Sequence, residues 1–439
     1  MPKAKNTISE IIGKMDYSPS RERMLQKIKK GFNEIASFYG FENVVSSFLE
    51  DVQFLNPLIK AGFFKKYPPL FCKTRGGAEF ILRPSGSFPA IRMYVTHKMS
   101  DFPYPAKLHF EGIRFFIDDD PGTLFKTQDE KGLVMIGEED PVAEAQIILI
   151  LWRALIQSGI GDQEFELRIN ATGCEICRPV FNAAFTGYFR SRSSRLCKSC
   201  KWHLKDSPTK ILRCQEERCA ILTNHAPTVL DFLCDACKKH LRQILEFLEE
   251  MHIPFVLDHR FFYDGFWLDT FIFEFISHVN FASSSGEKKE NNGSGFIFSE
   301  GGSMSRAAEL ITGKKMNVVN GTLFLKAIES FLYKKGISPP EPEKPKVFMV
   351  QLGELAKRKS IGVLEWLRSV NISAGEILGR DSIKSQLKVA ERMGAELALI
   401  IGQKEAIDGT VIVRELESGT QETIPQNKLV EFLKRKLKK

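Results

Sequence analysis

Hydrophobic positions in the first 160 residues follow a helical period at two places and a strand-like period between them. Residues 18–40 carry apolar side chains three and four positions apart after a Ser-Pro start and end at Gly40, which predicts a helix. Residues 141–159 are almost continuously apolar, which predicts a buried helix. Short strand-like runs lie between them: NVVSSFLE at 43–50, EFILR at 79–83, KLHFEGIRFFI at 107–117 and GLVMIG at 132–137. Helices combined with antiparallel-looking strands predict an α+β layer fold.

The pattern is interrupted over residues 171–240, which are rich in cysteine and basic side chains. A helix-like run at 234–251 follows, and then the strand-like runs IPFVLD at 253–258 and DTFIFEFIS at 269–277. Residues 282–295, ASSSGEKKENNGSG, are typical of a loop.

A second domain is predicted beyond the proline-rich run PPEPEKPK at 339–346. Proline neither continues a helix nor pairs in a central strand, so this run indicates a semi-rigid linker. Strand-like and helix-like segments alternate after it, which predicts a small α/β domain with a mostly parallel sheet. The segments are VFMVQL at 347–352, ELAKRKSIGVLEWLRSVN at 354–371, SIKSQLKVAERMG at 382–394, ELALIIG at 396–402, TVIVREL at 410–416 and a helix from about Gln426.

Eight of the nine cysteines fall into four close pairs within residues 174–237. Thiolates at these spacings suit tetrahedral zinc, and a site with four thiolates has no open position, so we expect one or two structural zinc ions. Disulfides or free buried thiols are the alternative, and an iron–sulfur cluster is a weaker one. The ligand candidates are Cys174, Cys177, Cys197, Cys200, Cys214, Cys219, Cys234 and Cys237.

Charge adds a modest indication of a polyanionic partner. The chain carries a formal +8. Seventeen Lys and Arg against twelve Asp and Glu give +5 over residues 346–439, and twelve against six give +6 over 171–240. A solvated basic surface explains these numbers equally well. The N-terminus has no apolar run of signal-peptide length, and the chain has no uncharged apolar run of 18 residues, so we expect a cytoplasmic protein without membrane contact.

The order of these parts resembles histidyl-tRNA synthetase, a class II aminoacyl-tRNA synthetase, over nearly the whole chain. Residues 382–433, from SIKSQLKVAERMG to NKLVEFL, look like that family's anticodon-binding domain. The insertion is similar through CEICRPVFNAAFTGYF, LCKSC, ILRC and the run from APTVLDFLCDACKKH to IPFVLD.

The resemblance implies an α+β, class II synthetase-like catalytic core built on an antiparallel sheet, with a Cys-rich insertion, followed by an α/β domain of the anticodon-binding type. It also implies a homodimer, although the proline of the family's first motif is replaced by Ser47. The expected parts are 1–165 and 249–336 for the core, 166–248 for the zinc-type insertion, 337–345 for the linker and 346–439 for the last domain.

The catalytic motifs are similar in frame but differ at the charged positions. RPSGS resembles a family stretch RPEGT, whose glutamate helps to hold the amino group of histidine; here that position is Ser85, after Arg83. KLHFEGIRFFIDDDP resembles the second motif, whose arginine clamps the ATP α-phosphate; here that position is Phe116. Arg114 lies two residues earlier, on the same face of the predicted strand.

Three further positions of the resemblance have also lost charge. YDGFWLDT corresponds to the histidine-specific motif RGLDYYT, with Tyr263 at the arginine and Phe266 at the aspartate, and EGGSMSR corresponds to a glycine-rich GGGRYD-like segment. VVNGTLFLKAI resembles the third motif, with Phe324 at its ATP-binding arginine. An apolar ring cannot stabilise the anionic transition state of adenylation, so the frame is that of an amino-acid pocket without its charges.

Three functions remain open from the sequence. The first is a non-catalytic paralogue that binds tRNA or another RNA, or has a regulatory role. The second is a divergent histidine–tRNA ligase that uses ATP and Mg²⁺, with Arg114, Arg306 or Asp269 replacing the lost groups. The third is a regulatory subunit of a histidine-biosynthesis enzyme, like the synthetase-related subunit of ATP phosphoribosyltransferase. Candidate RNA contacts are Arg380, Lys384, Lys388 and the terminal KRKLKK.

Overall fold

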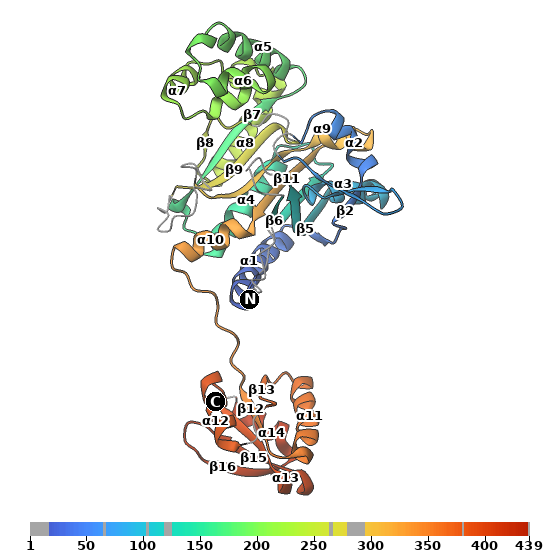
Figure 1. Cartoon of the computed structure of the whole chain (residues 1–439), viewed down its shortest axis with the longest axis vertical. Coiled ribbons are helices and arrows are strands. Elements are labelled where there is room, and N and C mark those ends of the chain that lie inside the picture. Colours follow the sequence, from blue (N-terminus) through green and yellow to red (C-terminus); the bar gives the residue numbers. More distant parts are fainter. Residues whose placement is uncertain are drawn as a thin grey trace, which may run out of the picture. The chain divides into compact units, whose positions relative to one another are not determined.

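The chain forms two compact units, Met1–Pro340 and Glu341–Lys439. The structure is a computed structural model that describes residues 17–64, 67–101, 105–117, 125–262, 267–278, 295–379 and 382–437 (Figure 1). In these ranges no helix is long and apolar enough to cross a membrane. Each unit is described by itself below.

An eight-stranded sheet forms the centre of the first unit, in the order β1-β5-β6-β11-β10-β9-β7-β8. The six central strands pair antiparallel, and β1 and β8 join the two edges in parallel. The chain between β1 and β5 forms a small antiparallel sheet of its own, in the order β2-β4-β3. The bounds are β1 Glu42–Val44, β2 Leu49–Asp51, β3 Leu70–Lys73, β4 Glu79–Leu82, β5 Ala106–Phe116, β6 Lys126–Ile136, β7 Phe165–Gly173, β8 Val256–Leu257, β9 Asp269–Ser277, β10 Ile297–Ser303 and β11 Val318–Phe324.

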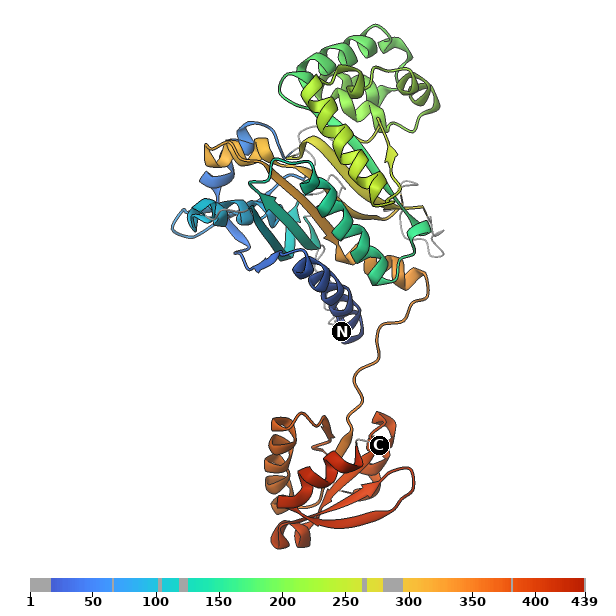
Figure 2. The ribbon, with the colours of Figure 1, turned by 180° about the vertical axis from the view of Figure 1, so that it is seen from behind.

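Helices cover one face of the large sheet and enclose the main hydrophobic core (Figure 2). They are α1 Pro19–Phe38, α4 Val142–Ser158, α8 Asp235–Glu250 and α10 Leu325–Lys334. Ser18 caps α1 by accepting from the amide of Arg21, and α4 ends where Gly159 takes a left-handed φ of 105°. The predicted helices at 18–40 and 141–159 are therefore confirmed as α1 and α4.

A second apolar cluster lies on the opposite face of the same sheet. It includes Phe88 of α3 and Ala308 of α9 together with Ile272 and Val318 of the sheet. The helices near this cluster are α2 Val52–Lys60, α3 Ser87–Thr96 and α9 Ser305–Thr312. Because side chains alternate along a strand, each strand serves both cores.

The Cys-rich insertion folds into short helices between β7 and α8. These are α5 Cys177–Arg190, α6 Lys198–Asp206 and α7 Glu217–Asn224. The short 3₁₀ segments of the chain are η1 Met99–Asp101, η2 Asp162–Glu164, η3 Ser193–Arg195, η4 Pro208–Arg213, η5 Val229–Phe232 and η6 Gln426–Lys428. The buried rings of Phe181, Phe185 and Phe189 stand one turn apart along α5 and join this insertion to the main core.

The second unit is a five-stranded sheet in the order β13-β12-β14-β15-β16. Its helices α11, α13 and α14 share one core, and α12 contributes to another. The bounds are β12 Val347–Gln351, α11 Glu354–Ser369, β13 Ala374–Glu376, α12 Ile383–Met393, β14 Leu397–Ile401, α13 Gln403–Asp408, β15 Thr410–Glu415, β16 Gln421–Pro425 and α14 Leu429–Lys436.

Three expectations for the strands were wrong. The sheet of the second unit is mixed, because only β12 pairs parallel with its neighbours, whereas β14–β15 and β15–β16 are antiparallel. The connections before β15 and β16 are too short for the crossover that a parallel pair needs. The predicted strand at 43–50 is two short strands, β1 and β2, and the run at 253–258 pairs only at Val256–Leu257. The predicted loop at 282–295 lies outside the described residues except for its last position.

Candidate functional site

The eight clustered cysteines come together as two groups of four. An inner group joins Cys174 and Cys177, at the turn from β7 into α5, to Cys234 and Cys237 at the start of α8. The Cys174 sulfur lies 3.4 Å from that of Cys177 and 3.9 Å from that of Cys234. All four sulfurs of the group lie within 4.8 Å of one another, so a single tetrahedral ion can reach them.

The outer group lies wholly between the two halves of the inner one in sequence. It consists of Cys197 and Cys200, at the start of α6, with Cys214 and Cys219 on either side of the start of α7. The sulfurs of Cys197 and Cys214 are 3.8 Å apart. These separations are well beyond a sulfur–sulfur bond of about 2.05 Å. The four sequence pairs thus combine first with fourth and second with third.

Backbone amides donate to sulfurs in both groups. The amide of Cys234 donates to the Cys177 sulfur at 3.1 Å, and the amide of Cys200 donates to the Cys197 sulfur at 3.3 Å. Burial opposes the charged form throughout; backbone amides help to outweigh it at Cys174 and Cys197, whose pKa is lowered to about 7, whereas burial raises the pKa of Cys177, Cys200, Cys219 and Cys237. The donor set of four thiolates fits zinc.

The large sheet carries a second constellation on the face of the smaller core. Arg114 on β5 lies opposite Gln128 on β6, and Glu130 lies opposite Phe324 on β11. Glu300 on β10 follows on the next strand. The strand register therefore brings these five side chains, which are far apart in sequence, together on one face of the sheet.

Arg114 is fully engaged within this patch. Its guanidinium donates to Glu300 at 2.8 Å and twice to the Gln128 side chain, and its side chain is only 2% exposed. The guanidinium carbon lies 4.4 Å from the ring centroid of Tyr67 and 4.5 Å from that of Phe324. Burial opposes its charge, but Tyr67 and Glu300 outweigh burial and raise the pKa of Arg114.

The rings of Phe116 and Phe324 also contact the guanidinium of Arg114. The Phe116 ring centroid lies 5.5 Å from the guanidinium carbon, and the ring also meets that of Tyr67 edge-on at 4.8 Å. The ring of Tyr67 also contacts that of Trp267, with 5.7 Å between the two centroids. We call Tyr67, Phe116, Phe324, Gln128 and Glu300 the Arg114 cage.

Arg83 is buried as well, and it donates mainly to backbone carbonyl oxygens. It donates to the carbonyl oxygens of Ile113 and Glu111 and to the Ser46 hydroxyl, and the ring of Phe48 lies 4.8 Å from its guanidinium carbon. Two of these bonds join the end of β4 to β5, and the third reaches the segment between β1 and β2, so the charge has a structural use.

Ser85 lies in a buried polar network in which one carboxylate oxygen has no hydrogen-bond donor. Its hydroxyl bonds Ser87, whose own hydroxyl accepts from the Asn320 side chain, and the amide of Gly86 donates to Glu130 at 2.6 Å. The second Glu130 oxygen is buried without a hydrogen-bond partner. Burial is the main cause that raises the pKa of Glu130.

The remaining candidate residues are spread over the chain. Tyr263, Phe266 and Arg380 lie outside the described residues. Lys384 and Lys388 are both exposed, one turn apart on α12 of the second unit.

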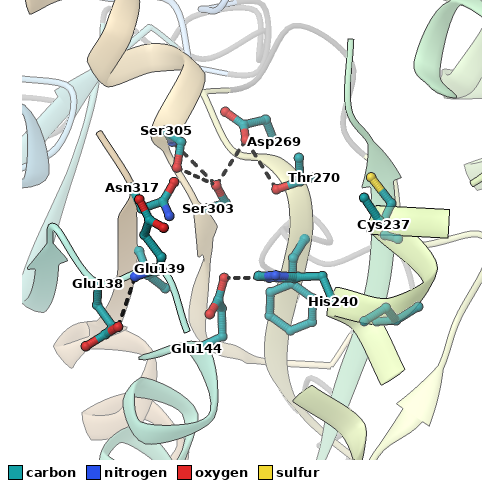
Figure 3. A pocket seen from close by; sticks show the side chains of 15 residues that line it. Glu138, Glu139, Glu144, Cys237, His240, Asp269, Thr270, Ser303, Ser305 and Asn317 are labelled. Atoms are coloured by element: carbon teal, nitrogen blue, oxygen red, sulfur yellow. Dashed lines mark hydrogen bonds and ion pairs between the residues drawn. The ribbon is translucent and has the colours of Figure 1, made fainter. Parts of the chain in front are cut away.

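Asp269 borders two cavities of about 270 and 640 Å³, and Arg306 borders the larger one. Arg306 pairs with the exposed Glu175, and Asp269 accepts from the Arg306 amide and the Ser303 hydroxyl. Figure 3 shows the smaller cavity, where Asp269 and Ser303 lie across from the bonded side chains of His240 and Glu144. Burial raises the pKa of Asp269, and its oxygens accept hydrogen bonds from the Arg306 amide and from the Ser303 and Thr270 hydroxyls.

Sequence reasoning missed the partners that neutralise Arg114. Gln128 lies before the predicted strand at 132–137 and was not considered. Glu300 is the first residue of EGGSMSR, but the resemblance gave it no role, and Tyr67 precedes two prolines outside any predicted element. The alternation of Arg114 and Phe116 on one face was the available signal, but it identified only their shared side of β5.

Comparisons with known proteins agree with this architecture. A sequence profile of the anticodon binding domain matches residues 346–436. The histidine–tRNA ligase of Pelotomaculum thermopropionicum is 28% identical over 426 residues, which cover 97% of each chain. That of Halothermothrix orenii is 31% identical over 364 residues, 83% of each chain.

Solved structures show the same fold. Apo histidyl-tRNA synthetase of S. aureus superimposes with a TM-score of 0.73 at 23% identity, covering 97% of this chain and 99% of that one. A protein of Bacillus halodurans described as an ATP phosphoribosyltransferase regulatory subunit/histidyl-tRNA synthetase gives 0.60 at 11% identity, covering 90% and 98%. The expected class II synthetase fold with an anticodon-binding domain is confirmed, and the chain belongs to the histidyl-tRNA synthetase family.

Proposed function

We propose that this chain is a histidyl-tRNA synthetase-like protein that binds tRNA or another RNA and does not adenylate an amino acid. The single observation that carries the proposal is the Arg114 cage. Adenylation needs a cationic group aimed at the charge that develops on the α-phosphate. The cationic side chain nearest to the altered second motif is instead neutralised by Glu300 and enclosed by aromatic rings.

Position as well as charge argues against transfer of the catalytic role to Arg114. A displacement of about 1 Å can cost 100-fold in rate, and a residue two places along a strand is displaced by about 6.6 Å. To reach a nucleotide, Arg114 would have to leave the buried Glu300 carboxylate without the cation that neutralises it, which is costly. Arg306, the other candidate, makes an exposed ion pair with Glu175, and the exchange assay below decides its role.

RNA binding is supported by the matched anticodon binding domain and by its basic side chains. Lys384 and Lys388 project from one exposed face of α12, and Arg380 precedes this helix in sequence. Phosphate contacts by such side chains make binding weaken with salt. The proposed place of action is the cytoplasm.

Zinc belongs to the proposal as a structural metal. Two ions, one in each cysteine group, would fix the insertion, and neither site has an open position for catalysis. Metal analysis should find two zinc ions per chain. Cys177→Ser and Cys219→Ser should each lower this to about one, whereas Cys72→Ser, outside both groups, should leave two. Unchanged zinc content in both variants would refute the assignment.

A homodimer is supported by an exposed apolar surface near the altered first motif. Large apolar side chains rarely gather on a free surface unless they meet a partner. They are Phe38, Val45, Phe48, Leu49 and Phe71, each at least 45% exposed. Light scattering at micromolar concentration should give twice the mass of the chain, and Val45→Glu should shift it toward the monomer.

Two measurements on one sample test the main proposal. ATP–pyrophosphate exchange with each of the twenty amino acids should stay at background, while tRNA should bind with an affinity that falls with salt. Exchange with histidine at a synthetase rate would establish the ligase alternative, with ATP and Mg²⁺ as co-reactants. Absence of RNA binding, together with co-purification of a histidine-biosynthesis enzyme, would favour the regulatory-subunit alternative.

A further inference from the structure

Helix α6 of the insertion exposes a tryptophan in a stripe of lysines. Its buried side chains are Cys200 and Leu204, which face the interior of the insertion. On the other side Lys198, Lys201, Trp202 and Lys205 are exposed, at spacings of three and four residues that place them on one face. Trp202 is 59% exposed, although burial of such a ring is strongly favourable.

The outer cysteine group holds this face in place. Cys197 is the N-cap of α6, and its sulfur accepts from the amide of Cys200. Trp202 follows Cys200 by two residues, so an ion bound there would fix the helix that presents the ring. Trp202 also meets the ring of His203 edge-on at 5.1 Å.

The surroundings of the stripe are mainly basic. Arg195 before the helix and Lys210 on η4, the segment that packs against α6, are exposed. Asp206, at the end of α6, is the exposed acidic side chain of this helix. A flat exposed ring flanked by cations suits an unpaired base that stacks on the ring while neighbouring phosphates meet the lysines.

We propose that this face of α6 is an RNA contact that stacks an unpaired base on Trp202 and binds the flanking phosphates with Lys198, Lys201 and Lys205. The inference rests on the RNA binding proposed above and adds a location and a mode to it. The recognised class is RNA with a single-stranded end or loop, because bases within a duplex do not offer a free face.

The test uses the full-length, zinc-loaded protein and the fluorescence anisotropy of a labelled tRNA transcript and of a labelled RNA duplex with blunt ends. Trp202→Ala should weaken tRNA binding about 5- to 150-fold, the range for loss of one stacked base, and should change duplex binding little. Trp202→Phe should retain most of the affinity. Tyr333→Ala, which removes a 73% exposed ring on α10, is the matched control and should bind like the unaltered protein.

The lysines are tested together through the salt dependence. Replacing Lys198, Lys201 and Lys205 by Gln should lower the slope of log affinity against log salt by about 2, since three phosphate contacts are lost. Zinc content and melting temperature are measured for every variant. If Trp202→Ala loses metal, Trp202→Phe and the lysine variant still decide the question.

The outcomes separate the two proposals. If the unaltered protein binds no RNA, the proposed function fails. If it binds tRNA and all α6 variants bind equally well, the RNA contact on α6 is overturned while the proposed function stands. Loss of binding to another protein, with RNA binding unchanged, would likewise overturn it and assign the face to a protein partner.

Discussion

Replacing Arg114 by methionine should destabilise the first unit strongly, because Arg114 has a structural role in the proposed function and no catalytic one. Arg114→Met keeps a long apolar side chain among the rings of Tyr67, Phe116 and Phe324 but removes the charge that pairs with Glu300. Both members of this pair are buried, at 2% and 5% side-chain exposure. The loss should therefore be dominated by the buried Glu300 carboxylate, which keeps the Tyr67 hydroxyl but loses its cation.

The magnitude follows from known buried pairs. Removing one partner of a buried ion pair costs about 3–5 kcal/mol, and at about 2.1 cal/mol/K of unfolding entropy per residue each kcal/mol lowers the melting temperature of the first unit, Met1–Pro340, by about 1.4 °C. We expect a drop of roughly 4 to 7 °C in the apparent melting temperature. Replacing Glu300 by methionine in the same protein should restore most of it, because an apolar substitute for both charges is often neutral.

The assay is thermal unfolding followed by near-ultraviolet circular dichroism, with zinc content checked in each sample. Arg306→Met is the matched control, because its ion pair with Glu175 is exposed and should be worth less than about 1 kcal/mol. If Arg114→Met melts within about 2 °C of the unaltered protein, Arg114 is not held by the cage and the central step of the proposed function fails.

Three further perturbations test other parts of the structure. Gly112→Ala would push a methyl group into the Arg83 guanidinium and should cost about 1–3 kcal/mol of unfolding free energy in denaturant titration, whereas Gly76→Ala, in open space, should cost little. Burial is the main cause that lowers the pKa of His109 to about 4, below its unfolded value near 6.5. The free energy of unfolding should therefore fall by at most about 3 kcal/mol as the pH drops from 6.5 to 4, and this loss should be smaller in His109→Phe. Gln386→Leu would remove the side-chain bonds to the Gln351 amide and carbonyl of β12 and should lower the free energy of unfolding of the second unit by roughly 2–5 kcal/mol in denaturant titration, whereas a loss under about 0.5 kcal/mol would contradict the role of these bonds.

Local patterns predicted the elements that depend on neighbouring residues. The helical period after Ser18 gave α1, and the alternation in KLHFEGIRFFI gave β5 with Arg114 and Phe116 on one face. These features are set within a few residues of chain, which is the range over which periodicity acts.

Long-range pairing could not be predicted in the same way. Glu300 lies 186 residues from Arg114 in sequence, and only the order of strands brings the two together. The cysteine spacings predicted four pairs of ligands, but which pairs share a group depends on how β7, α5 and α8 meet. The parallel arrangement expected for the last sheet failed because helix and strand alternation is compatible with either direction when connections are short.

The nesting of the cysteine groups sets an order in which the insertion can be assembled. The outer group closes a segment of about 23 residues and the inner one a segment of about 64, so closure of the longer loop carries about 1 kcal/mol more entropic cost. During synthesis the last outer ligand, Cys219, is made before the inner ligands Cys234 and Cys237 exist. With the proposed ions, the α6–α7 lobe can therefore close first, and the inner group then joins it to the sheet.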